Sequence, residues 1–229
     1  MKKITTLAVL IAGGIASGQA LAAGSATLEM AGNILPNGCD ISLPTTNLEW
    51  KNINTSSLSS TAFTDLPAKQ VTLSVNCLAE MSFAVRAMDN RAGQLPTGTK
   101  PSLAKNYFNF SSGSDDRVAA AVYTIKALVN GSTAGKDKAT AFITYKDGGW
   151  DWENPNKQSA YFINAKQSGD ITAALDMSTT SGMTDYPRTK AKSKVFALEI
   201  EPSVGPLTGQ NLAGGIDLQG STTFEVIYM

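Results

Sequence analysis

Apolar and polar residues alternate with a period of two along much of the chain. The alternation is regular in residues 71–77 and again in 81–87, and turn-forming residues separate such runs. Successive side chains of an extended strand point to opposite faces, so this period predicts strands with one buried face. The same pattern predicts strands at residues 106–110, 118–129, 140–146, 160–164, 171–175, 194–200 and 222–228. No long segment carries a helical stripe with capping residues.

The segments between the predicted strands are rich in Ser, Thr, Asn and Gly. The longest are residues 44–68, 89–105, 130–139, 147–159 and 176–193. We expect them to be surface loops, and we expect the basic stretch 188–194 to be solvated. No internal repeat and no linker between domains is found. Many short strands joined by such loops are typical of a one-domain antiparallel sandwich.

The first 22 residues have the order of a secretory signal peptide. Lys2 and Lys3 precede an apolar stretch at residues 7–15, and residues 20–22 form a small-x-small cleavage motif. No later stretch has enough apolar residues to span a membrane as a helix, so we expect no transmembrane segment. The sequence therefore predicts export, with cleavage after Ala22.

The charge balance and the absence of histidine exclude several function classes. The chain has 19 basic and 19 acidic residues, so it has no positive surplus to bind nucleic acid. With no histidine, Ser-His-Asp triads, Cys-His pairs and imidazole zinc sites are impossible. We expect no catalytic site, no cofactor and no metal.

Acidic residues leave one catalytic hypothesis open. The carboxylates that could be paired for glycoside hydrolysis are Asp115, Asp116, Asp147, Asp151 and Glu153. Acidic clusters in polar loops are more often solvated surface, and the spacing does not match a calcium-binding EF-hand loop. An enzyme is the least favoured of the three function classes considered.

The two cysteines, Cys39 and Cys77, are separated by 37 residues. An even pair in an exported protein predicts a disulfide bond. A redox or metal-binding pair is the alternative, but the chain has no Cys-x-x-Cys motif and no histidine to complete a site. The disulfide is the favoured interpretation.

Both ends of the mature chain carry a strand pattern. Within residues 23–38, positions 26–34 alternate strictly, although a leading segment is usually frayed and polar. The apolar face of this segment carries Ala26, Leu28, Met30, Gly32 and Ile34. At the other end, Phe224, Val226 and Tyr228 alternate up to Met229. The leading segment is either the first strand of its own sandwich or a strand donated to another molecule's sheet edge.

These features together resemble the fimbrial subunits of the chaperone–usher pathway. They are the signal peptide, the alternating segment before Cys39, the second cysteine at Cys77, Gly215 and the penultimate Tyr228. Subunits of that family have an immunoglobulin-like sandwich that lacks its last strand, so a hydrophobic groove lies open along one edge. A periplasmic chaperone lends a strand to the groove until the N-terminal arm of the next subunit replaces it.

The resemblance implies a fold, partners and roles for particular residues. It implies an incomplete immunoglobulin-like β-sandwich at residues 39–229, completed by a donated strand, with residues 23–38 as a donor arm. Ala26, Leu28, Met30, Gly32 and Ile34 would be the donated positions. Gly215, Phe224, Val226, Tyr228 and Met229 would line the groove and face the chaperone. The implied partners are the chaperone, the outer-membrane usher and neighbouring subunits, and the implied location is the periplasm and then a cell-surface fimbria that contributes to adhesion.

A tryptophan-containing segment supports a second hypothesis, a glycan-binding tip or adaptor subunit. Trp150, Asp151 and Trp152 could stack on a sugar ring and accept its hydroxyl groups. Such rings pack on a sandwich more often than they bind ligands. Adhesins of this pathway also usually carry a lectin domain in front, whereas here the arm directly follows the signal peptide. A structural subunit is therefore favoured over an adhesin.

Overall fold

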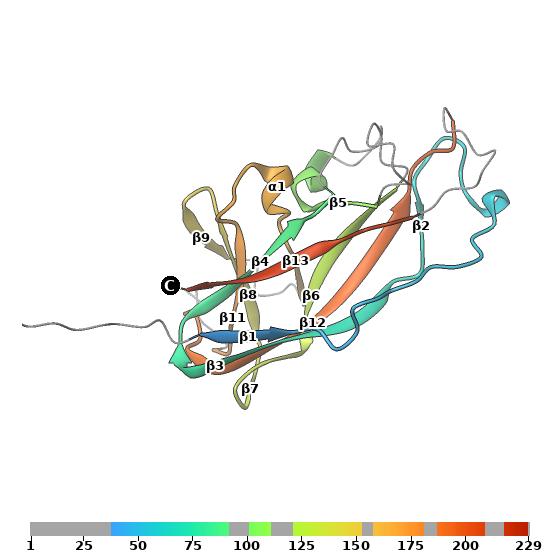
Figure 1. Cartoon of the computed structure of the whole chain (residues 1–229). Helices are drawn as coiled ribbons and strands as arrows, with labels where there is room; N and C mark the ends of the chain where they lie inside the picture. Colours follow the sequence, from blue (N-terminus) through green and yellow to red (C-terminus); the bar gives the residue numbers. More distant parts are fainter. Residues whose placement is uncertain are drawn as a thin grey trace, which may run out of the picture. The chain divides into compact units, whose positions relative to one another are not determined.

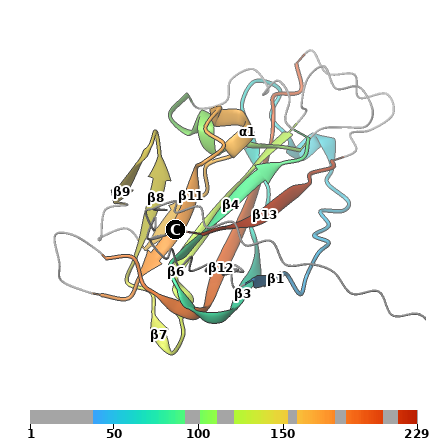
Figure 2. The same cartoon turned by 60° about the vertical axis from the view of Figure 1, so that its left-hand side comes forward.

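The structure, a computed structural model, describes residues 38–91, 101–110, 121–152, 158–180, 187–208 and 218–228. These residues form two antiparallel sheets that pack face to face (Figures 1 and 2). The all-β sandwich predicted from the sequence is confirmed. Among the described residues, no helix is both long and apolar enough to cross a membrane.

The first sheet has the strand order β1-β3-β12-β6-β10. Its strands are β1 (Cys39–Ser42), β3 (Lys69–Met81), β12 (Ala191–Val204), β6 (Ala121–Ala134) and β10 (Ser159–Tyr161). Three short strands extend it: β2 (Thr64–Asp65) pairs with β12, while β5 (Phe108–Asn109) and β7 (Asp137–Lys138) pair with β6. The order places β1 at one edge and β10 at the other.

The second sheet has the order β13-β4-β11-β8-β9. Its strands are β13 (Thr222–Tyr228), β4 (Phe83–Asp89), β11 (Ala174–Ser178), β8 (Ala141–Lys146) and β9 (Gly149–Trp152). The described helices are short: η1 (Thr55–Ser57), η2 (Pro101–Asn106) and α1 (Ala165–Ser168). β13 forms one edge of this sheet.

The core lies between the inward faces of the two sheets. In β3 every second residue from Val71 to Cys77 is buried, as the period-two pattern predicts. Phe142 of β8 and Phe196 of β12 stack across the interface with their ring centroids 6.5 Å apart. These contacts make one hydrophobic core shared by both sheets.

All five expected loops contain strand residues, so those predictions are wrong in part. β2 lies within residues 44–68, β4 ends at Asp89, and β7 lies within 130–139. β6 continues through residues 130–134, β9 lies within 147–159, and β11 and β12 extend into 176–193. In β6 the Asn-Gly pair forms a bulge rather than a turn, because Gly131 adopts φ +95°. At this bulge the backbone amide of Ala197 in β12 donates a hydrogen bond to the Ser132 hydroxyl at 2.9 Å, in place of a backbone carbonyl of β6.

Two other strands are displaced from their predicted positions. The strand predicted at residues 160–164 ends at Tyr161, and Asn164 instead caps α1 by accepting the Gln167 amide. The strand predicted at 171–175 begins at Ala174. The carboxylate of Asp170 accepts the Thr172 amide at 2.9 Å, which holds the preceding residues in a turn.

Lys194 is fully buried, so the expectation of a solvated basic loop at 188–194 is wrong at this end. The residue shares the inward face of β12 with Phe196 and Leu198, in phase with their period of two. Its ammonium group contacts Asp176 of β11 in the opposite sheet. The two sheets are therefore joined by a direct contact between two polar side chains inside the core.

Candidate functional site

Two edge strands border a groove on one side of the sandwich. Within the described part of the chain, β1 pairs as a strand with β3 alone and β13 with β4 alone. β1 and β13 also contact each other, which places both edges on the same side (Figure 1). Each strand therefore has one backbone edge without a strand neighbour among these residues. We call the space bordered by β1, residues 43–50 and β13 the β1–β13 groove.

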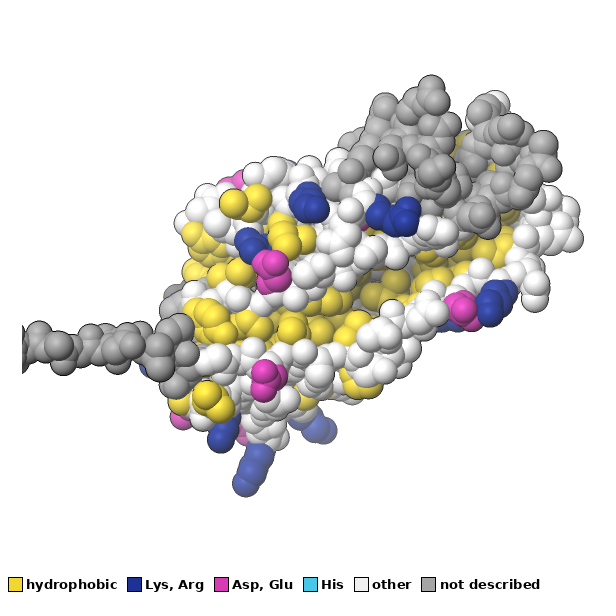
Figure 3. All heavy atoms as spheres, viewed as in Figure 1, with side chains coloured by type: hydrophobic (Ala, Val, Ile, Leu, Met, Phe, Trp, Pro, Cys, Tyr) yellow, Lys and Arg dark blue, Asp and Glu magenta, His cyan; other side chains and the backbone are white. Residues whose placement is uncertain are grey.

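The floor of the groove is apolar. Figure 3 shows a band of hydrophobic side chains between β13 and the chain formed by β1 and the segment after it. The partly buried residues that pack here against the core include Leu43, Leu48, Trp50, Phe224 and Val226. A continuous apolar band on a soluble domain usually marks a binding surface.

The burial of β13 shows that this edge is uncovered. Its residues 222–227 are all half-buried, and Tyr228 is 47% exposed. In β4, the strand paired with it, Phe83 and Val85 are fully buried. Phe224 packs edge-on against the ring of Phe162, with centroids 5.8 Å apart, yet its other side remains accessible. β13 thus contributes side chains to the core and leaves part of each uncovered.

The narrow end of the groove lies at the disulfide bond. Cys39 and Cys77 are joined, as predicted, and lie opposite each other in the β1–β3 pair. The amide of Cys39 donates to the hydroxyl of Tyr228, with an N–O distance of 3.0 Å. A side-chain hydroxyl therefore satisfies an edge amide that a neighbouring strand would otherwise bind.

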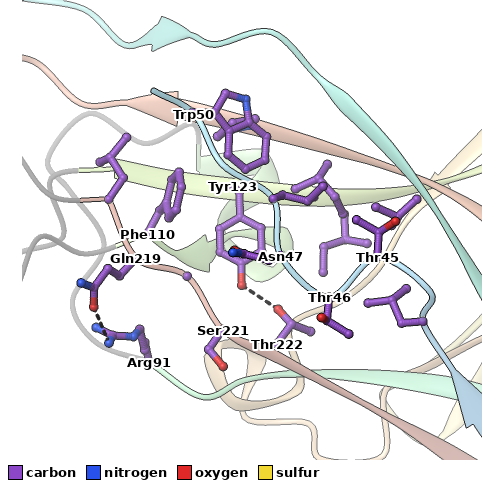
Figure 4. Close-up of a pocket in the computed structure, with 18 of the residues that line it drawn as sticks. Thr45, Thr46, Asn47, Trp50, Arg91, Phe110, Tyr123, Gln219, Ser221 and Thr222 are labelled. Carbon is purple, nitrogen blue, oxygen red and sulfur yellow. Dashed lines mark hydrogen bonds between the residues drawn. The ribbon is translucent and has the colours of Figure 1, made fainter. Parts of the chain in front are cut away.

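The wide end of the groove is a cavity of about 470 Å³ beside the start of β13. The rings of Trp50, Phe110 and Tyr123 line its wall, with Phe110 in contact with the other two (Figure 4). Phe110 contacts both neighbours edge-on, with centroids 5.8 Å from Trp50 and 5.7 Å from Tyr123. The indole N–H of Trp50 donates to the carbonyl of Pro67 at 2.8 Å, which fixes the ring.

Two pairs of polar side chains at the wide end are hydrogen-bonded to each other. The hydroxyls of Tyr123 and Thr222 lie 2.6 Å apart, and Arg91 donates to Gln219 at 2.8 Å (Figure 4). Burial raises the pKa of the Tyr123 phenol, so this hydroxyl stays neutral at physiological pH.

We expect Gly220→Ala to deform this cavity. A Cβ atom at position 220 would lie 2.7 Å from Cε1 of Tyr123 and 3.2 Å from Phe110, and both rings are buried. Such overpacking typically costs about 1–3 kcal/mol. Urea denaturation should show this loss, whereas Gly149→Ala, where an added Cβ meets nothing within 4 Å, serves as the control. A Gly220→Ala protein as stable as the wild type would contradict the described packing.

Comparison with known protein families gives one match, over residues 28–144, to the family described as protein of unknown function, DUF1120. The match covers 117 of the 229 residues, more than half of the chain. The chain belongs to the DUF1120 family. No curated protein matches the sequence. The DUF1120 match includes β1 and the cavity residues Trp50, Phe110 and Tyr123, whereas β13 lies beyond it.

Several residues singled out from the sequence lie outside the described residues. They are Ala26, Leu28, Met30, Gly32, Ile34, Gly215 and Met229. Of the proposed groove residues that the structure describes, Phe224 lines the cavity, Val226 packs against the core and Tyr228 binds the Cys39 amide. All three therefore lie at the β1–β13 groove.

The tryptophan segment lies on the β8–β9 hairpin of the second sheet. Residues 149–152 form β9, so the expectation of a loop is wrong here. The guanidinium of Arg188 lies over the ring of Trp150, 4.7 Å from its centroid, and Tyr145 meets this ring edge-on at 5.0 Å. The side chains of Asp151 and Trp152 lie outside the described part. One face of Trp150 is thus covered by protein, which weakens its case as a sugar platform.

Of the carboxylates considered for catalysis, Asp147 alone has a described side chain. Asp147 lies in the turn between β8 and β9, with φ 50°, while Asp115, Asp116 and Glu153 fall outside the described ranges. Within those ranges, no group of three or more His, Cys, Asp or Glu side chains could hold a metal ion.

Sequence reasoning missed one wall of the groove. Leu48 and Trp50 fall in the segment 44–68 that was expected to be an ordinary surface loop, and Leu43 directly precedes it. A signal was present, because these large apolar residues interrupt an otherwise polar stretch. Phe110 and Tyr123 were predicted only as strand residues, since nothing in their own pattern shows that a cavity borders them.

Proposed function

We propose that this chain is a structural subunit of a fimbria assembled by donor-strand exchange in the chaperone–usher pathway. The observation that carries the proposal is the β1–β13 groove, an apolar channel between two strands that each have a free backbone edge. The strand patterns at both ends of the mature chain add to it.

A strand is the occupant that best matches the chemistry of this groove. Free edges offer backbone hydrogen bonds, while an apolar floor accepts every second side chain of an added strand. Left uncovered, the same features promote aggregation. Periplasmic capping by a chaperone strand, followed by exchange for a neighbour's arm, would cover the groove at every stage.

The donor arm has the matching pattern. Leu28, Met30 and Ile34 lie on one face of residues 23–38, and burying each would contribute about 1.5–3 kcal/mol. Ordering the arm costs about 1–2 kcal/mol per residue in backbone entropy. Side-chain burial alone does not offset that cost, so hydrogen bonds to the groove edges must supply the remainder. In the assembled state, the arm of the neighbouring subunit replaces the Tyr228 hydroxyl as the hydrogen-bond acceptor of the Cys39 amide.

The proposal assigns partners and a route. The signal peptide directs the chain to the periplasm, where the chaperone binds the groove along β13. The outer-membrane usher then joins it to neighbouring subunits, and the resulting fimbria contributes to cell adhesion. The chain performs no catalysis in this role and needs no cofactor.

A synthetic peptide covering residues 24–36 tests the proposal. Added to the mature protein at about 1,000 times its Kd, it should raise the melting temperature by about 10 °C, because it binds only the folded state. Peptides with Leu28→Asp or Met30→Asp should have no effect, since a carboxylate would enter the apolar floor. The matched control, Thr27→Asp, changes the opposite face and should retain the effect. A stable monomer that ignores every peptide would overturn the proposal.

A further inference from the structure

A buried lysine and a buried aspartate meet in the core. Lys194 of β12 and Asp176 of β11 belong to different sheets. Both side chains are 0% exposed, and Nζ of Lys194 lies 2.5 Å from Oδ1 of Asp176. An amine and a carboxyl group are thus held in direct contact where water does not reach.

Neighbouring groups bind all but one of the polar atoms in this pair. Nζ of Lys194 also donates to the carbonyl oxygen of Phe83 at 2.8 Å and lies 4.4 Å from the centroid of the Phe83 ring. Oδ1 of Asp176 accepts the backbone amide of Met177 at 2.7 Å. Oδ2 has no hydrogen-bond partner among the described residues.

The surroundings favour the neutral forms of both groups. Desolvation by burial raises the pKa of Asp176 and lowers the pKa of Lys194. The attraction between the two groups opposes both shifts but is the smaller effect. The nearby charge of Arg188 further lowers the pKa of Lys194. A neutral amine is a nucleophile, and a protonated carboxyl group can lose its hydroxyl as water.

We propose that Lys194 and Asp176 become joined by an intramolecular amide bond. Nζ attacks Cγ of the protonated carboxyl group, so a C–N bond forms and the bond from Cγ to Oδ2 breaks. Oδ2 leaves as water, taking the carboxyl proton and one proton from the amine. No oxidant, reductant or other reactant is needed, and the product covalently links the two sheets.

The contacts already present fit the product. Its remaining N–H keeps the carbonyl of Phe83 as acceptor, and its carbonyl oxygen, Oδ1, keeps the amide of Met177 as donor. The atom that leaves, Oδ2, is the one without a partner. Holding the reactants in contact supplies effective molarities of up to about 10⁵–10⁸ M.

Intact-mass spectrometry of the reduced, unfolded wild-type protein tests this proposal. We expect a mass below that of the mature sequence by one water molecule. Trypsin should fail to cut after Lys194, and the peptide containing it should remain joined to the peptide containing Asp176. Lys194→Arg should restore the full mass, because a guanidinium does not form this bond. The same variant is the control for a succinimide at Asp176, which loses the same water: if Lys194→Arg still lacks one water molecule, a succinimide explains the loss and the proposal is overturned. A wild-type protein of full mass would overturn the proposal, and this result is independent of peptide binding at the groove.

Discussion

Lys194→Met is expected to destabilise the protein by about 3–5 kcal/mol, because it leaves the carboxyl group of Asp176 buried without its Lys194 partner. Asp176 is fully buried, and its second oxygen already has no partner among the described residues. Methionine fills much of the space of the lysine side chain, so lost packing contributes little. The loss should appear as a lower urea midpoint with an unchanged m-value.

Two further variants separate charge burial from packing. Lys194→Met combined with Asp176→Leu should recover most of the stability, since removing both partners of a buried pair is often neutral or stabilising. Lys192→Met changes an exposed lysine two residues away in the same strand and should stay within about 0.5 kcal/mol of the wild type. A single Lys194→Met variant as stable as this control would contradict the buried contact.

The pH dependence of the Lys194→Met protein follows from the same burial. Desolvation raises the pKa of Asp176 above its ordinary value, and without Lys194 only the Met177 amide and the charge of Arg188 oppose this rise. The folded state then binds a proton more tightly than the unfolded state does, so stability falls as the pH rises above about 4. We expect the variant to be more stable at pH 4 than at pH 7, relative to the wild type measured at both values.

Replacing both cysteines by serine has the second large expected effect. The disulfide closes a loop with a sequence separation of 38, which the chain-entropy model values at about 4 kcal/mol. β1 has only four residues, of which three are exposed, so few apolar contacts hold it in place. Losing the bond should therefore lower global stability and also loosen β1, one border of the groove.

Binding of the peptide covering residues 24–36 reports on the loosening of β1. The Cys39→Ser/Cys77→Ser protein should unfold at a lower urea concentration and bind the arm peptide more weakly than the wild type does. Wild-type protein in reducing buffer should behave like the double variant, which separates the bond from the substitutions. Unchanged stability in both samples would show that β1 is held by other contacts.

The sequence predicted most of the sandwich because period two reports directly on one buried face. It placed β13 at the observed residues and located β3 and β4, since each alternates cleanly. The prediction failed where a residue type typical of loops or of the surface has a different role in the fold. The Asn-Gly pair at residues 130–131 forms a bulge, and Lys194 was assigned to solvent by its charge although its phase places it inward.

The groove could be predicted only in outline. Which strands become sheet edges depends on strand order, a tertiary property that no local pattern reports. The wall formed by residues 43–50 has no regular secondary structure and therefore no period to recognise. The disulfide was predictable, because two cysteines leave one possible pairing.

Amide hydrogen exchange along β13 tests the central claim most directly. The free edge of β13 should leave every second amide of residues 222–228 unprotected in the protein alone. Binding of the peptide covering residues 24–36 should slow exchange at those amides, while the Leu28→Asp peptide should leave them fast. If the wild-type peptide stabilises the protein without protecting β13, or if these amides are already protected in its absence, the groove is not the site of strand donation.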